Sequence, residues 1–212
     1  MKTNTLLIAT GNPHKIRKIS EMFAGQKVQI QTPEQAGVVL EIDEDKITFE
    51  ENATLKAVEY SKLYGGVVIA TDGGMTIPSL EDWDSLRTKR FAGELATDEE
   101  RIAQLLVRMA NKKGSERRMV WREAIALAKG GKKLFSIEVQ GAEGMMAASF
   151  NPKYYRPGIW VCSIWEFPQF SSKNFFELSD DEVKAAEISW GRLGDALGIY
   201  LSENKYFAQM SA

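Results

Sequence analysis

The stretch TLLIATGNPHK, residues 5–15, decides the fold. Its apolar start is typical of a buried β-strand, and the turn residues that end it are followed by apolar residues at helical spacing. Pro13 suits the first turn of a helix because no backbone N–H is needed there, and Asn12 or Thr10 can cap the free amides. The stretch therefore predicts a strand, a tight turn and a helix in direct succession.

A second stretch, VVIATDGGM at residues 67–75, also reads as an apolar strand that runs into turn residues. Asp72 precedes two glycines, so we expect its carboxylate to be exposed at the carboxyl end of the strand, where α/β proteins usually bind ligands. The alternative is an ordinary turn residue, because Asp is common in turns.

The remaining patterns indicate a mixed α/β chain with long β-hairpins. Runs on either side of Gly130 and Gly131 favour a hairpin, although residues 123–129 are equally compatible with a helix. Spacings from Thr97 to Glu100 and from Ser179 to Glu182 match capping boxes. The further predicted elements are a strand near 27–32, helices over 49–64 and after 97, and a helical region from 179 to about 202.

The composition is that of an ordinary globular protein, with 44% hydrophobic and 26% charged residues among 212. This length predicts one domain, residues 1–212. The 27 basic and 29 acidic side chains give a net charge of −2, so no strong positive field is present to hold a nucleic acid or an anionic membrane. We expect a small-molecule partner.

Two scarce residues narrow the chemistry. Cys162 is the single cysteine and His14 the single histidine, which excludes an internal disulfide and a multi-histidine metal site. Catalysis is therefore expected to use carboxylates, lysines and a hard metal ion. The chain also lacks the long apolar run of a signal peptide or membrane span, so a cytoplasmic protein is expected.

The loop between the first strand and helix has the features of an anion site. Unpaired amides at a helix start attract phosphate, Gly11 allows close approach, and Lys15 emerges one turn into the helix. The alternative is a plain turn with Lys15 in solvent.

Acidic residues cluster between this loop and Asp72. Glu41, Asp43, Glu44, Asp45, Glu50 and Glu51 belong to this run. Such a run is often only a solvated surface. Two or three carboxylates near a polyphosphate would instead bind Mg²⁺, which prefers carboxylate and phosphate oxygens.

Three motifs, in this order and spacing, resemble successive motifs of the inosine triphosphate pyrophosphatase family, also called Ham1-like. They are LIATGNPHK at residues 7–15, TFEENATLKA at 48–57 and ATDGGM at 70–75. The resemblance continues through 90–93 and 96–98, so it covers the N-terminal half of the chain.

The resemblance implies an α/β fold with an elongated mixed β-sheet flanked by helices, two lobes, a nucleotide cleft between them, and usually a homodimer. The implied reaction converts a nucleoside triphosphate and water to the monophosphate and pyrophosphate, with Mg²⁺. Matched by position, Asp72, Lys15 and Glu44 would be catalytic, and Glu44, Asp72 and Glu51 would hold the metal. The implied substrate contacts are Thr10, Gly11, Asn12, Lys15, Lys56, Gly73, Trp160, Ser189 and Trp190.

The chain also departs from the family pattern. Thr71 stands where the family usually has a second acid, and the segment 158–163 lacks the aspartate of the base-recognition motif. Purine specificity therefore does not transfer. Trp160, Trp165 and Trp190 are candidates for base stacking, and the alternative is that they belong to the core or a dimer interface.

These observations predict a Mg²⁺-dependent nucleoside triphosphate pyrophosphatase acting on an NTP or dNTP, with a base preference altered from ITP and XTP. The alternative is a non-catalytic nucleotide-binding or regulatory protein that retains the phosphate loop. A Maf-like pyrophosphatase is a weaker third candidate, because that family opens with different loop chemistry.

Overall fold

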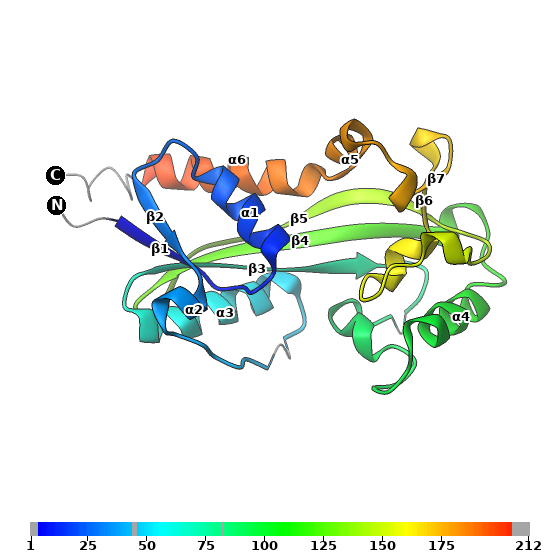
Figure 1. Ribbon diagram of the computed structural model, residues 1–212, viewed down its shortest axis with the longest axis horizontal. Helices are drawn as coiled ribbons and strands as arrows, with labels where there is room; N and C mark the ends of the chain where they lie inside the picture. The colour runs from blue at the N-terminus through cyan, green and yellow to red at the C-terminus, as the bar shows by residue number, and fades with distance from the viewer. Residues whose placement is uncertain (1–3, 44–45, 82, 205–212) are drawn as a thin grey trace. The chain divides into compact units, whose positions relative to one another are not determined.

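The computed structural model describes residues 4–43, 46–81 and 83–204. Seven strands form one mixed sheet in the order β2-β1-β3-β4-β5-β6-β7, and Figure 1 shows the elements. The strands are β1 (Asn4–Ile8), β2 (Val28–Gln31), β3 (Val67–Thr76), β4 (Arg118–Lys129), β5 (Lys132–Met146), β6 (Trp165–Phe167) and β7 (Lys173–Asn174). The helices are α1 (Pro13–Met22), α2 (Pro33–Ala36), α3 (Phe49–Tyr64), α4 (Asp98–Arg108), α5 (Asp180–Ala186) and α6 (Ile188–Glu203). The mixed α/β prediction is therefore confirmed.

The chain divides into two compact units. Unit 1 comprises residues 1–73, 123–139 and 189–212, and unit 2 comprises residues 74–122 and 140–188. The strands β3, β4 and β5 contribute residues to both units. The nucleotide cleft and the single domain over 1–212 stay predictions.

In unit 1, three parallel strands place the first loop beside Asp72. The strand β1 pairs with β2 on one side and β3 on the other, and Ile8 lies opposite Ile69. The amide of Ala9 still donates to the Ile69 carbonyl at 2.8 Å. The loop of residues 10–12 therefore leaves β1 at the level where Thr71 and Asp72 follow on β3.

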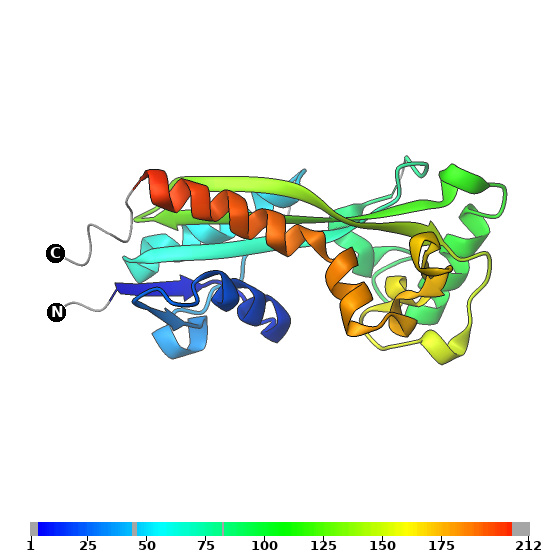
Figure 2. The ribbon, with the colours of Figure 1, turned by 90° about the horizontal axis from the view of Figure 1, so that it is seen from above.

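Helices cover both faces of the sheet in unit 1. The helices α1 and α6 lie on one side of the strands and α3 on the other (Figures 1 and 2). One core cluster contains alternate strand residues together with Ile19 of α1 and Leu193 of α6. Its strand members are Leu6, Ile8, Val67, Ile69, Ile125 and Leu127.

Successive side chains of a strand point to opposite faces of the sheet. The face on which a polar strand residue lies can therefore be read from its spacing to the cluster residues of the same strand. Thr71 continues the series of Ile69, and Glu123 precedes Ile125 by two positions, so both face α1 and α6. Asp72 faces the side that α3 covers.

The helix α3 follows the predicted pattern closely. A capping box joins Thr48 and Glu51 at its start, and Gly65 ends it in the left-handed conformation with φ of 71°. The apolar face buries Phe49, Ala53, Ala57 and Tyr60, whereas Tyr64 is half-buried.

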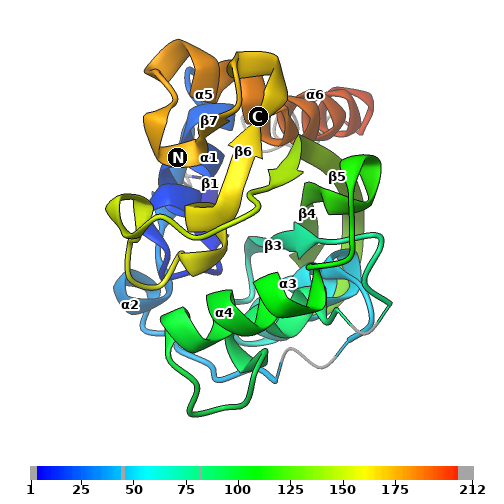
Figure 3. The same ribbon diagram turned by 90° about the vertical axis from the view of Figure 1, so that its right-hand side faces the viewer.

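In unit 2, the helix α4 begins as predicted, at a capping box between Thr97 and Glu100. Its buried Ile102 and Leu105 join a core that also contains Trp160 and Trp165. Figure 3 shows α4 and β6, which face the viewer. Among the described helices, none combines the length and hydrophobicity that crossing a membrane requires.

Three predicted boundaries need correction or refinement. Residues 123–129 are strand, within β4, and not helix. The C-terminal helical region is two helices, because α5 ends at its cap Glu187 before α6 begins. The strand β3 does not end at residue 70 but continues to Thr76, so Asp72 lies inside a strand.

Candidate active site

The loop after β1 is built as the sequence predicts. The side-chain carbonyl of Asn12 accepts hydrogen bonds from the amides of His14 and Lys15 at 2.9 and 3.3 Å. The hydroxyl of Thr10 accepts one from the Asn12 amide at 3.2 Å. A Cβ built on Gly11 would meet no atom within 4 Å, so the space above the loop is open.

This capping limits which amides remain for a ligand. Pro13 has no N–H, and Asn12 already satisfies the next two amides of α1. Within the described part of the chain, no hydrogen bond involves the Gly11 amide. Of the first helical amides and the loop before them, Gly11 is therefore the one best placed to donate to an anion.

Lys15 is not a solvent-exposed lysine. Its Nζ lies 3.0 Å from Oε1 of Glu123, and the exposed fractions of the two side chains are 17% and 2%. The alternative of a plain turn with Lys15 in solvent is thus wrong. The pair joins the first turn of α1 to β4, on the α1 and α6 face of the sheet.

Asp72 forms the second buried ion pair. Its Oδ1 lies 3.5 Å from Nζ of Lys56, and each side chain is 13% exposed. The predicted exposed carboxylate at a strand end is therefore wrong: Asp72 is held inside β3, opposite a lysine from α3. The partly exposed Gly73 follows it in the strand.

The sheet separates the two pairs by face. Lys15 and Glu123 lie on the side of α1 and α6, whereas Lys56 and Asp72 lie on the side of α3. The loop of residues 10–12 leaves the end of β1 at the level of Asp72 on β3.

Thr71 directly precedes Asp72 in β3 and is buried. It is 1% exposed, and its hydroxyl oxygen has no hydrogen-bond partner. A neutral residue therefore occupies the position where the resemblance leads us to expect a second acid.

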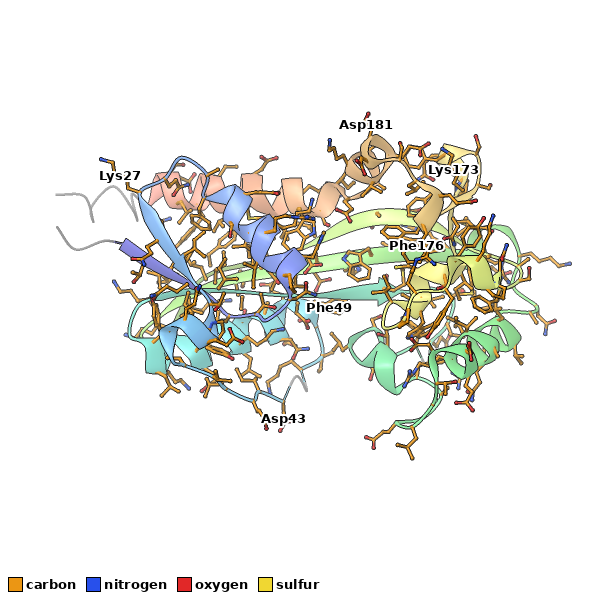
Figure 4. The ribbon with its side chains drawn as sticks, viewed as in Figure 1. Lys27, Asp43, Phe49, Lys173, Phe176 and Asp181 are labelled. Carbon is orange, nitrogen blue, oxygen red and sulfur yellow. The ribbon has the colours of Figure 1, made fainter. Side chains whose placement is uncertain are left out.

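The acidic residues before and at the start of α3 have different surroundings. Oε2 of Glu51 accepts hydrogen bonds from the amides of Ile47 and Thr48, at 3.1 and 3.2 Å, and so closes the start of its own helix. Oε1 of Glu50 accepts one from the Ser136 hydroxyl at 2.6 Å. Figure 4 shows Asp43 on the loop before α3, where it is exposed. Glu44 and Asp45 lie outside the described residues.

The described residues alone do not make up a metal site. In residues 4–43, 46–81 and 83–204 there is no group of three or more acid, histidine or cysteine side chains placed to hold a metal ion. Mg²⁺ needs only one or two carboxylates when substrate phosphates supply further oxygens, so Asp72 fits as one ligand. Because Oε2 of Glu51 already caps α3, this acid has one oxygen left for a metal.

Residues at the start of α6 pack beside α1 in unit 1. Ser189 and Trp190 are buried in its first turn, and the Trp190 ring lies edge-on to His14 with centroids 6.1 Å apart. Trp190 packs with Leu193 and Leu197 in the core of unit 1.

The other tryptophans lie in the core of unit 2. The Trp160 ring packs against Trp83 and Phe91, at centroid distances of 6.3 Å in each case. Trp165 is 2% exposed and stacks with Phe175. This burial favours the core alternative for both residues, and substrate contact by Trp160 or Trp190 stays a prediction.

Glu123 is the site residue that the sequence did not reveal. The sequence marks residue 123 only as the start of a segment that is compatible with either strand or helix. The available signal was an acid at the head of the apolar run AIALA, residues 124–128, where burial requires a cationic partner.

A sheet with the parallel strands β2, β1 and β3, covered by helices on both faces in unit 1, defines an α/β protein. The chain belongs to the Ham1 family, whose model matches residues 6–149.

Individual relatives agree with this assignment. A protein of Caldanaerobacter subterraneus named dITP/XTP pyrophosphatase is 33% identical over 73% of this chain and 80% of its own length. One of the same name from Streptococcus mutans is 38% identical over 50% of this chain, but the match spans only 33% of that protein. The structure of a HAM1 protein from Coxiella burnetii has a TM-score of 0.77 and 26% identity, covering 94% of this chain and 99% of the other.

Proposed function

We propose that the protein is a nucleoside triphosphate pyrophosphatase that hydrolyses an NTP or dNTP to the monophosphate and pyrophosphate. The observation that carries this proposal is the register of β1 and β3, with Ile8 opposite Ile69, which brings the open phosphate loop to the level of Asp72. The names of the relatives support the same chemistry.

The side chains of unit 1 suit a reaction that needs positioning and charge neutralisation more than covalent catalysis. The Gly11 amide and the ammonium of Lys15 would bind phosphate oxygens. Lys56 would offset further negative charge and keep Asp72 in place. The Asp72 carboxylate would orient the attacking water by accepting its hydrogen bond.

The proposed cofactor is Mg²⁺, held by Asp72 and by Glu44. When bound, it would polarise the phosphoryl group under attack. Glu51 is a third candidate ligand through its Oε1, because its other oxygen caps α3.

The test is pyrophosphate release from a panel of NTPs, dNTPs, ITP and XTP with Mg²⁺, by wild type and by Asp72→Asn. Loss of the Asp72 charge is expected to lower kcat by about a hundredfold or more, as for other groups that stabilise the reacting charge. The matched control is Asp195→Asn on α6, an exposed aspartate in the same unit, which should keep full activity. Equal activity in wild type and Asp72→Asn would contradict the proposal.

A second candidate function is nucleotide binding without turnover. The buried Thr71, whose hydroxyl oxygen has no partner, favours it because one expected carboxylate is missing from β3. Calorimetric nucleotide binding by the wild type without pyrophosphate release would establish this alternative, and many turnovers would exclude it.

The proposed assembly rests on the family resemblance, and the proposed base preference rests on the departure from the family pattern at residues 158–163. We propose a homodimer in the cytoplasm, with a base preference that differs from that for ITP and XTP. Sedimentation at two protein concentrations tests the dimer, and the ratio of kcat/KM values over the nucleotide panel tests the preference.

A further inference from the structure

The pair of Lys15 and Glu123 is asymmetric in its access to solvent. The Lys15 side chain is 17% exposed, whereas the Glu123 side chain is 2% exposed, and Nζ and Oε1 are 3.0 Å apart. The Lys15 side chain therefore keeps some access to solvent, whereas the Glu123 side chain is buried on the α1 and α6 face of the sheet.

The position of Lys15 in the fold ties this pair to the phosphate loop. Lys15 lies in the first turn of α1, and its amide is bonded to the Asn12 side chain at 3.3 Å. Glu123 comes from β4, two strands away from β1 in the sheet order. The contact thus anchors the cation next to the loop from a different part of the chain.

A buried carboxylate needs such a partner, because an unpaired ion in a low-dielectric interior is strongly unfavourable. The same contact has a second effect. A polyphosphate that binds Lys15 also approaches the negative charge behind it, and Coulomb repulsion is weakly screened there.

We infer that Glu123 is a positioning residue that holds Lys15 at the phosphate loop and, as its counter-charge, weakens the binding of pyrophosphate. This inference rests on the proposed function, since pyrophosphate is the expected product. Glu123 would thereby favour product release after the lysine has helped to neutralise the substrate.

The test compares wild type with Glu123→Gln, which keeps an acceptor for Lys15 but removes the charge. Binding of inorganic pyrophosphate is measured by calorimetry in the presence of Mg²⁺. We expect the Kd of the variant to fall by about tenfold, because one weakly screened unit charge near the ligand is lost. A damaged fold would weaken binding, so a gain in affinity separates the charge effect from a structural one.

Two control variants are used. One keeps the charge at residue 123, and the other removes a carboxylate from a different ion pair. Glu123→Asp keeps the charge and should bind pyrophosphate within about twofold of wild type. Glu59→Gln removes a carboxylate that pairs with Lys62 at 2.5 Å on the exposed side of α3, and should not change the Kd. If Glu123→Gln does not fold, Glu123→Asn replaces it as an uncharged side chain that still offers Lys15 an acceptor.

The outcomes distinguish this inference from the proposed function. An unchanged or higher Kd in the folded neutral variants would overturn the inference alone. Tighter pyrophosphate binding without hydrolysis of any nucleotide would support the inference and contradict the proposed function. No pyrophosphate binding by wild type or variant would contradict both.

Discussion

Asp72 and Glu123 are both acids inside strands, and each is held by a lysine from a helix. Asp72 pairs with Lys56 and Glu123 with Lys15. A buried ion pair contributes little to net stability when compared with apolar residues in the same place. Two such pairs near one loop therefore point to chemistry more than to stability.

Cys162 is a residue whose environment makes it chemically inert. The residue is 8% exposed, and burial, with a smaller contribution from the negative charge of Glu187, raises the pKa of its thiol to about 12. The thiolate is the reactive form, so a raised pKa leaves little of it at pH 8.

We expect the native protein to react with a thiol reagent at pH 8 about a thousandfold more slowly than an unperturbed cysteine. The rate should rise about tenfold per pH unit up to the pKa, as the thiolate fraction grows. Spectrophotometric titration with a disulfide reagent measures it, and one equivalent should react in denaturant. Rapid, complete modification of the native protein would show that Cys162 is not buried as described.

At the scale of elements, the start of α3 links stability to the candidate site. The Thr48 hydroxyl accepts a hydrogen bond from the Glu51 amide at 3.1 Å, and the Glu51 carboxylate accepts one from the Thr48 amide at 3.2 Å. Asn52 extends this arrangement, because its Oδ1 accepts from the Lys46 amide at 3.2 Å. The helix thus holds residues 46–48 of the acidic loop through two successive side chains.

Thr48→Ala removes one half of the capping box and should lower the free energy of unfolding by about 1 kcal/mol. Urea denaturation measures the change. Thr54→Ala, within the same helix, is the matched control and should stay within about 0.5 kcal/mol of wild type. Equal stability of Thr48→Ala and the control would mean that the cap is energetically unimportant.

The turn between β4 and β5 depends on the conformational freedom of two glycines. Gly130 and Gly131 adopt φ of 56° and 78°, a region that favours glycine. A Cβ on Gly131 would also approach Cγ of Lys62 to 2.9 Å. The two glycines thus allow a tight hairpin that continues into long strands on each side.

At the scale of the whole molecule, the two units share three strands. Each of β3, β4 and β5 runs through residues of both units, so neither unit consists of a continuous segment of chain. Strand hydrogen bonds and core packing are cooperative, and breaking a shared strand affects both units.

We therefore predict one cooperative unfolding transition for the full chain, consistent with a single domain over residues 1–212. Calorimetry and denaturation followed by tryptophan fluorescence should give coincident midpoints. The fluorescence reports both units, because Trp190 lies in unit 1 and Trp160 in unit 2. Two resolved transitions would show that the units unfold independently.

Much of the fold could be predicted because its signals are local. The strand–turn–helix at the N-terminus depends on an apolar run and on Asn12 and Pro13, which act on their nearest neighbours. The predicted capping boxes of α4 and α5 likewise join residues three positions apart.

The candidate site was predicted less completely. Lys15, Lys56 and Asp72 were identified from motifs, but their partners were not. Apolar periodicity does not show how far a strand extends past its last hydrophobic residue, so Asp72 was misplaced at a strand end. The sequence did not predict the ion pair of Glu123 with Lys15, because no local pattern marks an acid that contacts a lysine 108 positions away.

The sequence by itself determined the N-terminal strand, turn and helix, the starts of α4 and α5 and the family motifs, because short-range hydrogen bonding and hydrophobic spacing encode them. Only the tertiary structure decided which charges meet. Strand alternation and the packing of α1 and α3 on opposite faces of the sheet assign Glu123 to Lys15 and Asp72 to Lys56, and ion pairing between distant segments depends on that packing.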